Sequence, residues 1–360
     1  MRCCGKGGAE MSFSGLLRYG ALATKLKSMS GKLLTAAQLE ELKSKQTVTE
    51  AVGYLKYDTA YREVLEPVRE EEVHRDLLEW LLHISAFEDF VKLQHFMNIS
   101  DRRFLQTWLV RHEINMLKLI IRRVGTGEAF HGVIYKVPRE FQAISRIDFS
   151  KMEQAHTVED VIEALHGIPY QRVLRAAYGQ ETQNGETAYF DMETQLDIYY
   201  YTNLWRQIKR SLQGKNRNKM EQYVGYEADI LNLLWIYRSK KYYHMPHDFI
   251  YALLIPVHGR LREKEIKRLV EADSPEGIVA IAKENKYTDI FSKHDNGLYE
   301  RTLLQLQLKL MKKMNGGNAY QLTAAFEYLG AKQLELDNIG SIIECIRYRI
   351  PKEEMWRYVV

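Results

Sequence analysis

The sequence predicts an all-helical protein, and three observations carry this prediction. Only 7 of the 360 residues are proline, which breaks helices, while the helix-favouring residues Leu, Glu, Lys, Ala and Met are plentiful. Apolar residues recur every three or four positions along several long segments, which is the period of a helix with one buried face. Finally, one pattern of helix starts and long helices occurs three times along the chain.

The composition indicates a folded protein with a sizeable core. Hydrophobic residues make up 46% and charged residues 27%, and 360 residues favour two or three domains or a repeat array over a single domain. The net charge is only +4. An obligate nucleic-acid-binding protein would normally concentrate basic charge on one face. We therefore expect no nucleic-acid partner.

The cysteines and the apolar runs suggest a reducing compartment and no transmembrane segment. Cys3, Cys4 and Cys345 are too few for a disulfide framework and lack metal-ligand spacing. No apolar run reaches the length needed to cross a bilayer, and the amino terminus lacks the apolar stretch of a signal peptide. Residues 1–10 are predicted to be a disordered extension. Lipidation of Cys3 and Cys4, or a natural start at Met11, are the alternatives.

A helix start followed by a tyrosine recurs at three places, roughly 110 residues apart. In each copy an N-capping residue is followed three positions later by an acid, then by two apolar residues, a tyrosine and two further apolar residues. The first copy contains Thr47, Glu50, Val52, Leu55, Tyr61, Val64 and Leu65. The second copy contains Thr157, Asp160, Ile162, Leu165, Tyr170, Val173 and Leu174. The third copy, more diverged, contains Asp273, Glu276, Ile278, Ile281, Tyr287, Ile290 and Phe291.

These residues make physical sense as helix starts. We expect Thr47, Thr157 and Asp273 to be N-caps, with a capping box between Thr47 and Glu50 and close variants in the other copies. The apolar residues three positions apart are expected to be buried, and each tyrosine is expected near the start of a second short helix.

A second marker follows each copy and lies within a long amphipathic stretch. The three markers are Glu113-Ile114-Asn115, Glu227-Ala228-Asp229 and Glu335-Leu336-Asp337. We expect Glu113, Glu227 and Glu335 to occupy one equivalent helical site. The order of elements thus repeats as well, and it predicts three helical repeat domains near residues 11–140, 141–250 and 251–360.

No catalytic, cofactor-binding or metal-binding residue is predicted. Residues 5–8 contain glycines but lack the spacing of a phosphate loop. His244 and His247 lie three apart, but Pro246 breaks the helix that would direct both rings at one metal ion. Residues 199–201 are three consecutive tyrosines, which are expected to pack between helices rather than stack on bases. Residues 260–268 form a basic helix, expected to be solvated, with an acidic partner as the alternative.

The order of these motifs resembles the C subunit of the bacterial and archaeal V/A-type rotary ATPases, the counterpart of the d subunit of eukaryotic V-ATPases. The resemblance covers Ser12 to Val360 and is closest at residues 336–339, followed by Ile343 and Arg347. Asn115 departs from the marker pattern, and Gly277 and Phe291 depart from the repeat; these departures affect the repeat alignment more than the family resemblance.

The resemblance implies a pseudo-threefold funnel of three helical domains at the cytoplasmic face of the membrane. It implies a non-catalytic rotor protein that links the D and F subunits of the central stalk to the membrane proteolipid (c/K) ring. Such a rotor protein couples ATP hydrolysis or synthesis to proton or sodium transport, and has no cofactor of its own. ATP chemistry then belongs to the A and B subunits.

Two other classes of protein share some of these features. A generic helical-repeat scaffold in a soluble complex would show the same repeats, and it is the main alternative. A helical enzyme such as an isoprenoid synthase would carry acidic metal-binding motifs such as D-D-x-x-D, which this sequence lacks.

Overall fold

The computed structural model describes residues 13–66, 68–70, 75–125, 144–178, 185–287, 290–291 and 299–359. Every regular element in these ranges is helical, so the all-helical prediction is confirmed. The long helices are α1 (Phe13–Ser30), α5 (Arg75–Gln94), α6 (Ile99–Gly125), α11 (Gly185–Ser211), α12 (Gly214–Lys241), α16 (Tyr299–Asn315) and α17 (Thr323–Arg347). The short ones are α2 (Ala36–Lys43), α3 (Val48–Asp58), α4 (Arg62–Leu65), α8 (Phe149–Met152), α9 (Val158–Ala164), α10 (Pro169–Tyr178), α13 (His247–Ala252), α14 (Glu263–Val270), α15 (Pro275–Glu284) and the 3-10 helix η3 (Lys352–Arg357).

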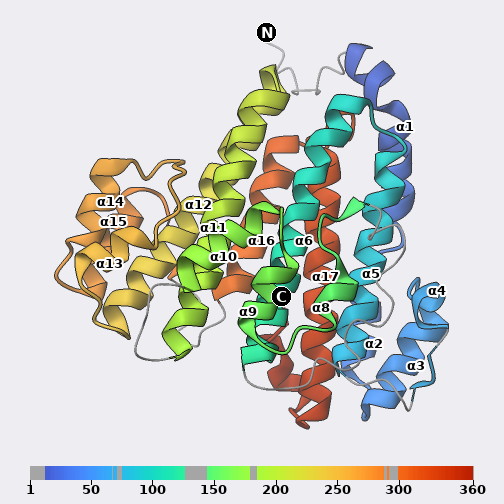
Figure 1. Cartoon of the computed structure of the whole chain (residues 1–360). Coiled ribbons are helices and arrows are strands. Elements are labelled where there is room, and N and C mark those ends of the chain that lie inside the picture. The colour runs from blue at the N-terminus through green and yellow to red at the C-terminus, as the bar shows by residue number, and fades with distance from the viewer. Residues whose placement is uncertain are drawn as a thin grey trace. The chain divides into compact units, whose positions relative to one another are not determined.

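The chain divides into two compact units. One comprises the described residues up to Arg102 together with Leu304–Val360, and the other comprises Arg103–Leu303. In the first unit α17 packs against α1, α2, α3 and α5. The last long helix of the chain therefore lies among the first helices, as the red and blue ribbons show (Figure 1).

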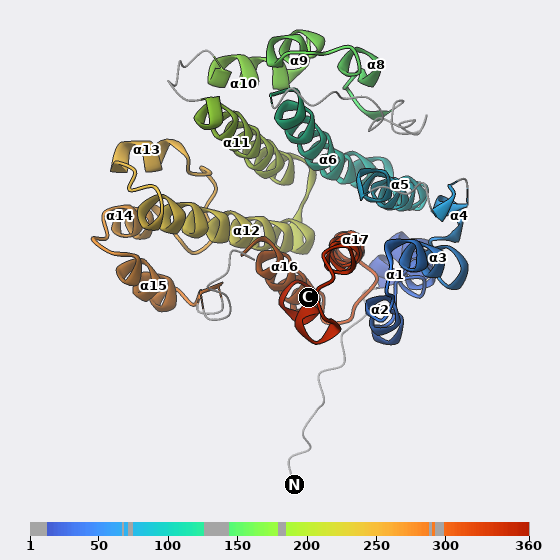
Figure 2. The same cartoon turned by 90° about the horizontal axis from the view of Figure 1, so that it is seen from below.

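In the second unit, short helices are attached to long ones in two groups. Helix α10 packs against α9 and α11, and α8 packs against α9, so these three short helices form a row beside α6 and α11 (Figure 2). Helices α13, α14 and α15 each pack against α12. Residues around most of the circumference of α12 are buried, as expected for a helix covered on several sides.

The helix starts agree with two of the three predicted caps. Thr47 and Thr157 are N-caps, and each side chain accepts the backbone N–H three residues later. The capping box is complete at Thr157 and Asp160. In the first copy the Glu50 carboxylate instead accepts the N–H of Gln46 at 3.0 Å, so the box predicted there is wrong in its second half.

The third predicted cap is wrong by one residue. Ser274, not Asp273, caps α15, and its hydroxyl accepts the N–H of Gly277 at 3.2 Å. Pro275 explains the shift. Proline is favoured at the first helical position because its missing N–H has no intrahelical acceptor there, which leaves the preceding residue as the cap.

The predicted apolar positions form the cores of the three groups of short helices. Each pair that was expected to be buried is at most 9% exposed: Val52 and Leu55, Ile162 and Leu165, Ile278 and Ile281. Burying each such side chain contributes about 1.5–3 kcal/mol relative to leaving it in water.

A further repeat, not identified from the sequence alone, forms the corners after α12 and α17. Residues 243–246 (Tyr-His-Met-Pro) and 348–351 (Tyr-Arg-Ile-Pro) share one pattern. The basic residue has positive φ, 48° at His244 and 54° at Arg349, and proline precedes the next helix. The N–H of Ile350 returns to the Cys345 carbonyl, as in a Schellman helix end. A third occurrence, at residues 135–138 (Tyr-Lys-Val-Pro), lies outside the described residues.

Candidate functional site: three tyrosine–carboxylate centres

The three repeated tyrosines each donate a hydrogen bond to a buried carboxylate on a long helix. The pairs are Tyr61 with Glu335 at 2.6 Å, Tyr170 with Glu113 at 2.5 Å and Tyr287 with Asp229 at 2.6 Å. The tyrosines are at most 2% exposed and the carboxylate residues at most 6%. A hydrogen bond from a neutral hydroxyl to an ionised carboxylate is stronger than a hydrogen bond between two neutral groups. We call each pair a tyrosine–carboxylate centre.

Each carboxylate also binds the chain that leads into a short helix. Glu335 accepts the N–H of Leu34, just before α2. Glu113 accepts the N–H of Arg146 at 2.8 Å and the hydroxyl of Ser145 at 2.6 Å, just before α8. Asp229 accepts three N–H groups of residues 259–261 at 2.6–3.0 Å, just before α14. Each centre therefore joins a long helix to both ends of one group of short helices.

The partners show which copies belong together. Tyr170 of the second copy is bound by Glu113 of α6, which carries the first marker, and Tyr287 of the third copy by Asp229 of α12, which carries the second marker. The tyrosine of the first copy is bound by the last long helix, 274 residues away in sequence. The last carboxylate, Glu335, thus binds the first tyrosine, Tyr61.

The predicted equivalence of Glu113, Glu227 and Glu335 is wrong at the middle position, because Asp229 is the carboxylate of that centre. The backbone at Gly259 approaches the backbone of α12 so closely that a Cβ built on Gly259 would lie 2.7 Å from the Gly225 carbonyl carbon. At this short separation the shorter side chain of Asp229, two residues further along the helix, reaches the N–H groups.

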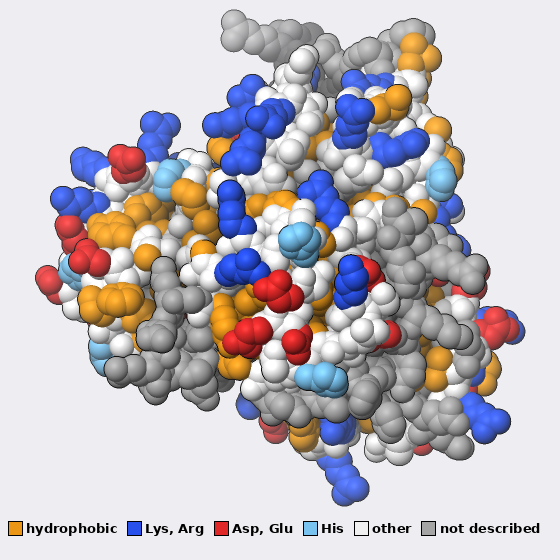
Figure 3. Space-filling view, viewed as in Figure 1, with side chains coloured by type: hydrophobic (Ala, Val, Ile, Leu, Met, Phe, Trp, Pro, Cys, Tyr) orange, Lys and Arg blue, Asp and Glu red, His pale blue; other side chains and the backbone are white. Residues whose placement is uncertain are grey.

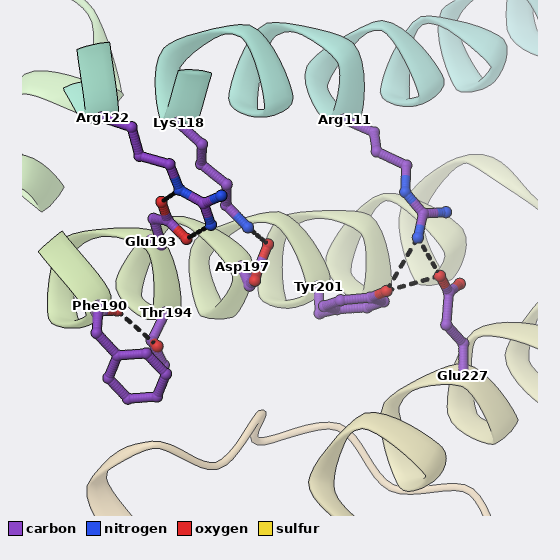
Figure 4. Close-up of polar contacts among 9 residues, drawn as sticks. All are labelled: Arg111, Lys118, Arg122, Phe190, Glu193, Thr194, Asp197, Tyr201 and Glu227. Carbon is purple, nitrogen blue, oxygen red and sulfur yellow. Dashed lines mark hydrogen bonds and ion pairs between the residues drawn. The ribbon is translucent and has the colours of Figure 1, made fainter. Parts of the chain in front are cut away.

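Glu227 belongs instead to a second polar cluster (Figure 4). Its carboxylate accepts the Tyr201 hydroxyl at 2.6 Å and pairs with Arg111 of α6. Glu227 is 1% exposed. The cluster therefore ties α6, α11 and α12 together through one buried carboxylate.

Two more ion pairs extend this contact along α6 and α11 (Figure 4). Lys118 pairs with Asp197 at 2.5 Å, and Arg122 pairs with Glu193. Residue numbers rise along α6 as their partners' numbers fall along α11, so the two helices run antiparallel. The signal was present in the sequence, as basic residues seven and four apart on one helix and acids four apart on the other.

Burial shifts the pKa of the three tyrosines and of Asp229. Burial, reinforced by the adjacent carboxylate, raises the pKa of Tyr61, Tyr170 and Tyr287 well above that of a free tyrosine. Burial also raises the pKa of Asp229, although its hydrogen bonds from Tyr287 and the backbone oppose this shift. The three tyrosines therefore remain protonated donors at neutral pH.

The Tyr61 centre carries an additional cation. The ammonium group of Lys332 donates to the Tyr61 hydroxyl at 2.7 Å and lies 3.5 Å from Glu335. Lys332 is 7% exposed, and burial lowers the pKa of its ammonium group. A polar pocket of about 210 Å³ adjoins this lysine and is also lined by Lys25, Asp89 and Tyr328.

The remaining sequence motifs lie at the surface, in the core or outside the described residues. His244 and His247 are exposed around the turn before α13. Tyr200 and Tyr201 are buried between helices, as predicted. The helix predicted over 260–268 begins at Glu263, so Arg260 and Arg262 precede α14 and the other basic residues lie within it. Residues 1–10, including the glycines at 5–8, lie outside the described part of the chain.

The described residues offer neither a cluster of metal ligands nor a membrane span. Within those ranges no three or more His, Cys, Asp and Glu side chains are grouped so that they could hold a metal ion. Of the helices they contain, none is both long and apolar enough to cross a membrane. What the described centres do is mechanical: each fixes a long helix to a group of short ones.

Comparison with known proteins identifies the family of this chain. Residues 22–358 match the family model of the ATP synthase (C/AC39) subunit. The C subunit of the A-type ATP synthase of Methanobrevibacter smithii is 24% identical, over 91% of this chain and 84% of its own length. The proteins of the same name from Methanosphaera stadtmanae and Methanocaldococcus jannaschii are each 22% identical, over 92% and 91% of this chain and 85% and 83% of their own lengths. The chain therefore belongs to the ATP synthase (C/AC39) subunit family and is a structural, non-catalytic C subunit of an A/V-type ATPase.

Proposed function

We propose that this chain is the rotor component that links the D and F subunits of the central stalk to the membrane proteolipid ring. In this role it couples ATP hydrolysis or synthesis to the transport of protons or sodium ions. It lies at the cytoplasmic face of the membrane as a peripheral part of the complex. The predicted three-domain funnel, with boundaries near residues 140 and 250, belongs to the same proposal.

The observation that carries this proposal is the family match combined with the three tyrosine–carboxylate centres. A protein that transmits torque must resist deformation between its attachment points. Helices packed at crystal-like density are stiff, and buried, fully satisfied polar networks rigidify a core further. Here such a centre recurs at three junctions between a long helix and a group of short ones.

The closure of the first unit by α17 supports the same role. Glu335 binds both Leu34 and Tyr61, so the carboxyl-terminal helix fastens the segment from α2 to α4. Without this contact, force applied to one end of the chain could peel away the first short helices. With it, unfolding of either end requires breaking a buried charge-assisted hydrogen bond.

Co-purification tests the proposal. An affinity-tagged copy of the chain is isolated from detergent-solubilised membranes and, in parallel, from the soluble fraction without detergent, and the partners are identified by mass spectrometry. The proposal predicts the D and F subunits and the proteolipid in the membrane preparation. Recovery of a soluble protein complex without the proteolipid would instead favour the generic helical scaffold.

A further inference from the structure

The polar pocket beside Lys332 lies within the first unit. Its volume is about 210 Å³, and its lining comes from α1, the segment after α1, the start of α4, α5 and α17. All of these residues belong to the first unit. Pockets that hold drug-sized molecules measure about 300–1,000 Å³, so the ligand whose size suits this pocket is a small molecule or an ion.

Lysines from three helices and one connecting segment line this pocket. They are Lys25, Lys32, Lys92 and Lys332. On the face shown in Figure 3, Lys and Arg side chains are spread over the surface, many of them singly, where water solvates their charge. Lys332 differs, because it is 7% exposed. A charge that is removed from water in this way requires compensation from nearby groups.

The acidic residues of the lining are largely occupied by other partners. Glu88 and Asp89 lie 3.3 Å and 3.9 Å from one ammonium group, that of Lys92. Asp89 also accepts the hydroxyl of Tyr328 at 2.6 Å. The third acid, Glu63, is an exposed residue of α4. The two acids of α5 therefore compensate Lys92 and leave the other three lysines.

Lys25 and Lys32 form no ion pair with a carboxylate in the part of the chain that the structure describes. The ammonium group of Lys25 lies 5.8 Å from the centre of the Phe96 ring, and Lys32 is exposed. Each ammonium group carries three hydrogen-bond donors. Both lysines can therefore donate to a ligand in the pocket.

Lys332 shares its carboxylate with two other donors. Glu335 accepts the Tyr61 hydroxyl and the N–H of Leu34, and it lies 3.5 Å from the ammonium group of Lys332. Burial lowers the pKa of this ammonium group. An anion in the pocket would oppose that shift, because a nearby opposite charge favours the charged form.

We propose that this pocket binds a small oxyanion of the phosphate class, held by Lys25, Lys32 and Lys332. A phosphate ion has acceptor oxygens that point in several directions, and lysine binds phosphate as a point charge, so separate ammonium groups can share one such ion. A metal cation is disfavoured, since the described residues contain no cluster of metal ligands. The bound anion would join α1 to α17 and so stabilise the first unit.

Phosphorus NMR of inorganic phosphate tests this with the purified full chain in a phosphate-free buffer at constant ionic strength. We expect saturable line broadening with half-saturation at about 1 mM phosphate. The unfolding temperature should rise by about 2 °C at about 10 mM phosphate. Absence of saturable broadening up to about 10 mM would overturn the proposal. Displacement of phosphate by an equal concentration of acetate would contradict the choice of a phosphate-class ligand.

A double variant locates the site. Lys25→Met with Lys32→Met should weaken phosphate binding by about tenfold or more, which is the loss of at least one charge-assisted contact. The matched control is Lys27→Met with Lys283→Met, which removes the same charge from exposed positions outside the lining and should leave the affinity unchanged. Circular dichroism shows that both variants are folded.

Two further outcomes contradict the proposal. Equal line broadening by the pocket variant and the wild type would place the phosphate elsewhere. Phosphate also stabilises proteins in general by exclusion from their surface. An equal rise in unfolding temperature in the pocket variant and the wild type would therefore reflect that general effect. None of these measurements depends on the rotor assignment, which co-purification of the wild-type chain tests separately.

Discussion

The hydroxyl groups of Tyr61, Tyr170 and Tyr287 do the same work in three places. Each is buried and donates to a carboxylate that also accepts protein donors from the chain entering a short helix. A buried carboxylate that loses a donor carries a desolvation cost that water cannot compensate. Loss of the tyrosine hydroxyl would therefore leave each buried carboxylate one donor short.

Replacing one of these tyrosines by phenylalanine should lower the free energy of unfolding. We expect about 1–3 kcal/mol for Tyr61→Phe, Tyr170→Phe or Tyr287→Phe, because the ring stays while the carboxylate loses a buried donor. Urea unfolding followed by circular dichroism measures the change. Tyr57→Phe is the control: its hydroxyl bonds to Glu70 at the surface, and we expect less than about 0.5 kcal/mol. Equal effects at Tyr57 and at the buried positions would contradict this role.

The raised tyrosine pKa values also predict steep alkaline destabilisation. Above pH about 10 the unfolded chain releases each tyrosine proton while the native state retains it. The unfolded state then binds fewer protons, so the free energy of unfolding falls by about 1.4 kcal/mol per pH unit for each such tyrosine. Below pH about 10 the contribution is constant. Urea titrations between pH 9 and 11 should show a slope reduced by that amount in Tyr170→Phe; an unchanged slope would mean that Tyr170 titrates normally.

At the scale of elements, close backbone contact determines how α12 meets the segment before α14. A methyl group at residue 259 would collide with the backbone of Gly225 and with the Asp229 carboxylate, both at 2.7 Å. Neither obstacle is the flexible end of a long side chain. The two glycines therefore allow Asp229 to reach its three N–H donors.

Gly259→Ala should consequently destabilise the protein by about 1–3 kcal/mol, the usual cost of overpacking. Gly20→Ala is the matched control, because a Cβ there meets nothing within 4 Å and the residue lies inside α1. There the same substitution should stabilise the protein by up to about 1 kcal/mol, since alanine favours helix. Thermal and urea unfolding compare the two, and a Gly259→Ala protein as stable as Gly20→Ala would refute the contact.

The Arg111–Glu227 pair is the element-scale counterpart of the tyrosine centres, since together with Tyr201 it joins three long helices. Arg111→Met should cost about 3 kcal/mol, because it leaves the buried Glu227 carboxylate without its cation. Arg175→Met is the control, since Arg175 and Glu163 form an exposed pair whose loss should cost less than about 1 kcal/mol. If the two substitutions proved equally mild in urea unfolding, Glu227 would have to be satisfied by Tyr201 alone.

The helices themselves can be predicted from the sequence more fully than the contacts between them. Caps and apolar spacing identify the helix that begins after Thr157 and the burial of Ile162 and Leu165. The marker around Glu227 correctly predicts a long helix but not which acid meets the tyrosine. That choice depends on how closely Gly259 approaches α12, and a backbone separation of this kind leaves no periodic signal in the sequence.

At the scale of the whole molecule, the order of the repeats differs from the order of their contacts. Local similarity along the chain places each tyrosine and the marker that follows it in one copy. In three dimensions the tyrosine is bound by the preceding long helix, and Tyr61 by the last one. Such long-range pairing costs loop-closure entropy, which no local pattern records. For this reason the sequence predicts the members of the centres without predicting their pairing.

This pairing links the stability of the first helices of the chain to that of its last long helix. Helix α17 packs on α1, α2, α3 and α5, and Glu335 fastens Leu34 and Tyr61. Removal of α17 would therefore expose the faces of α1, α2, α3 and α5 that it covers. In the proposed rotor role, this interlocking prevents load at one end of the chain from detaching the other.

The coupling of ATP hydrolysis to ion uptake tests the central claim most directly. Membranes from a strain that lacks this chain are compared with membranes from the same strain complemented with the wild-type chain, and both activities are measured side by side. We expect the ATP-hydrolysing subunits to remain active while ion uptake stops, because the proposed link between stalk and ring is missing. Complementation should restore uptake. Ion uptake that persists at normal efficiency without this chain would contradict the coupling role.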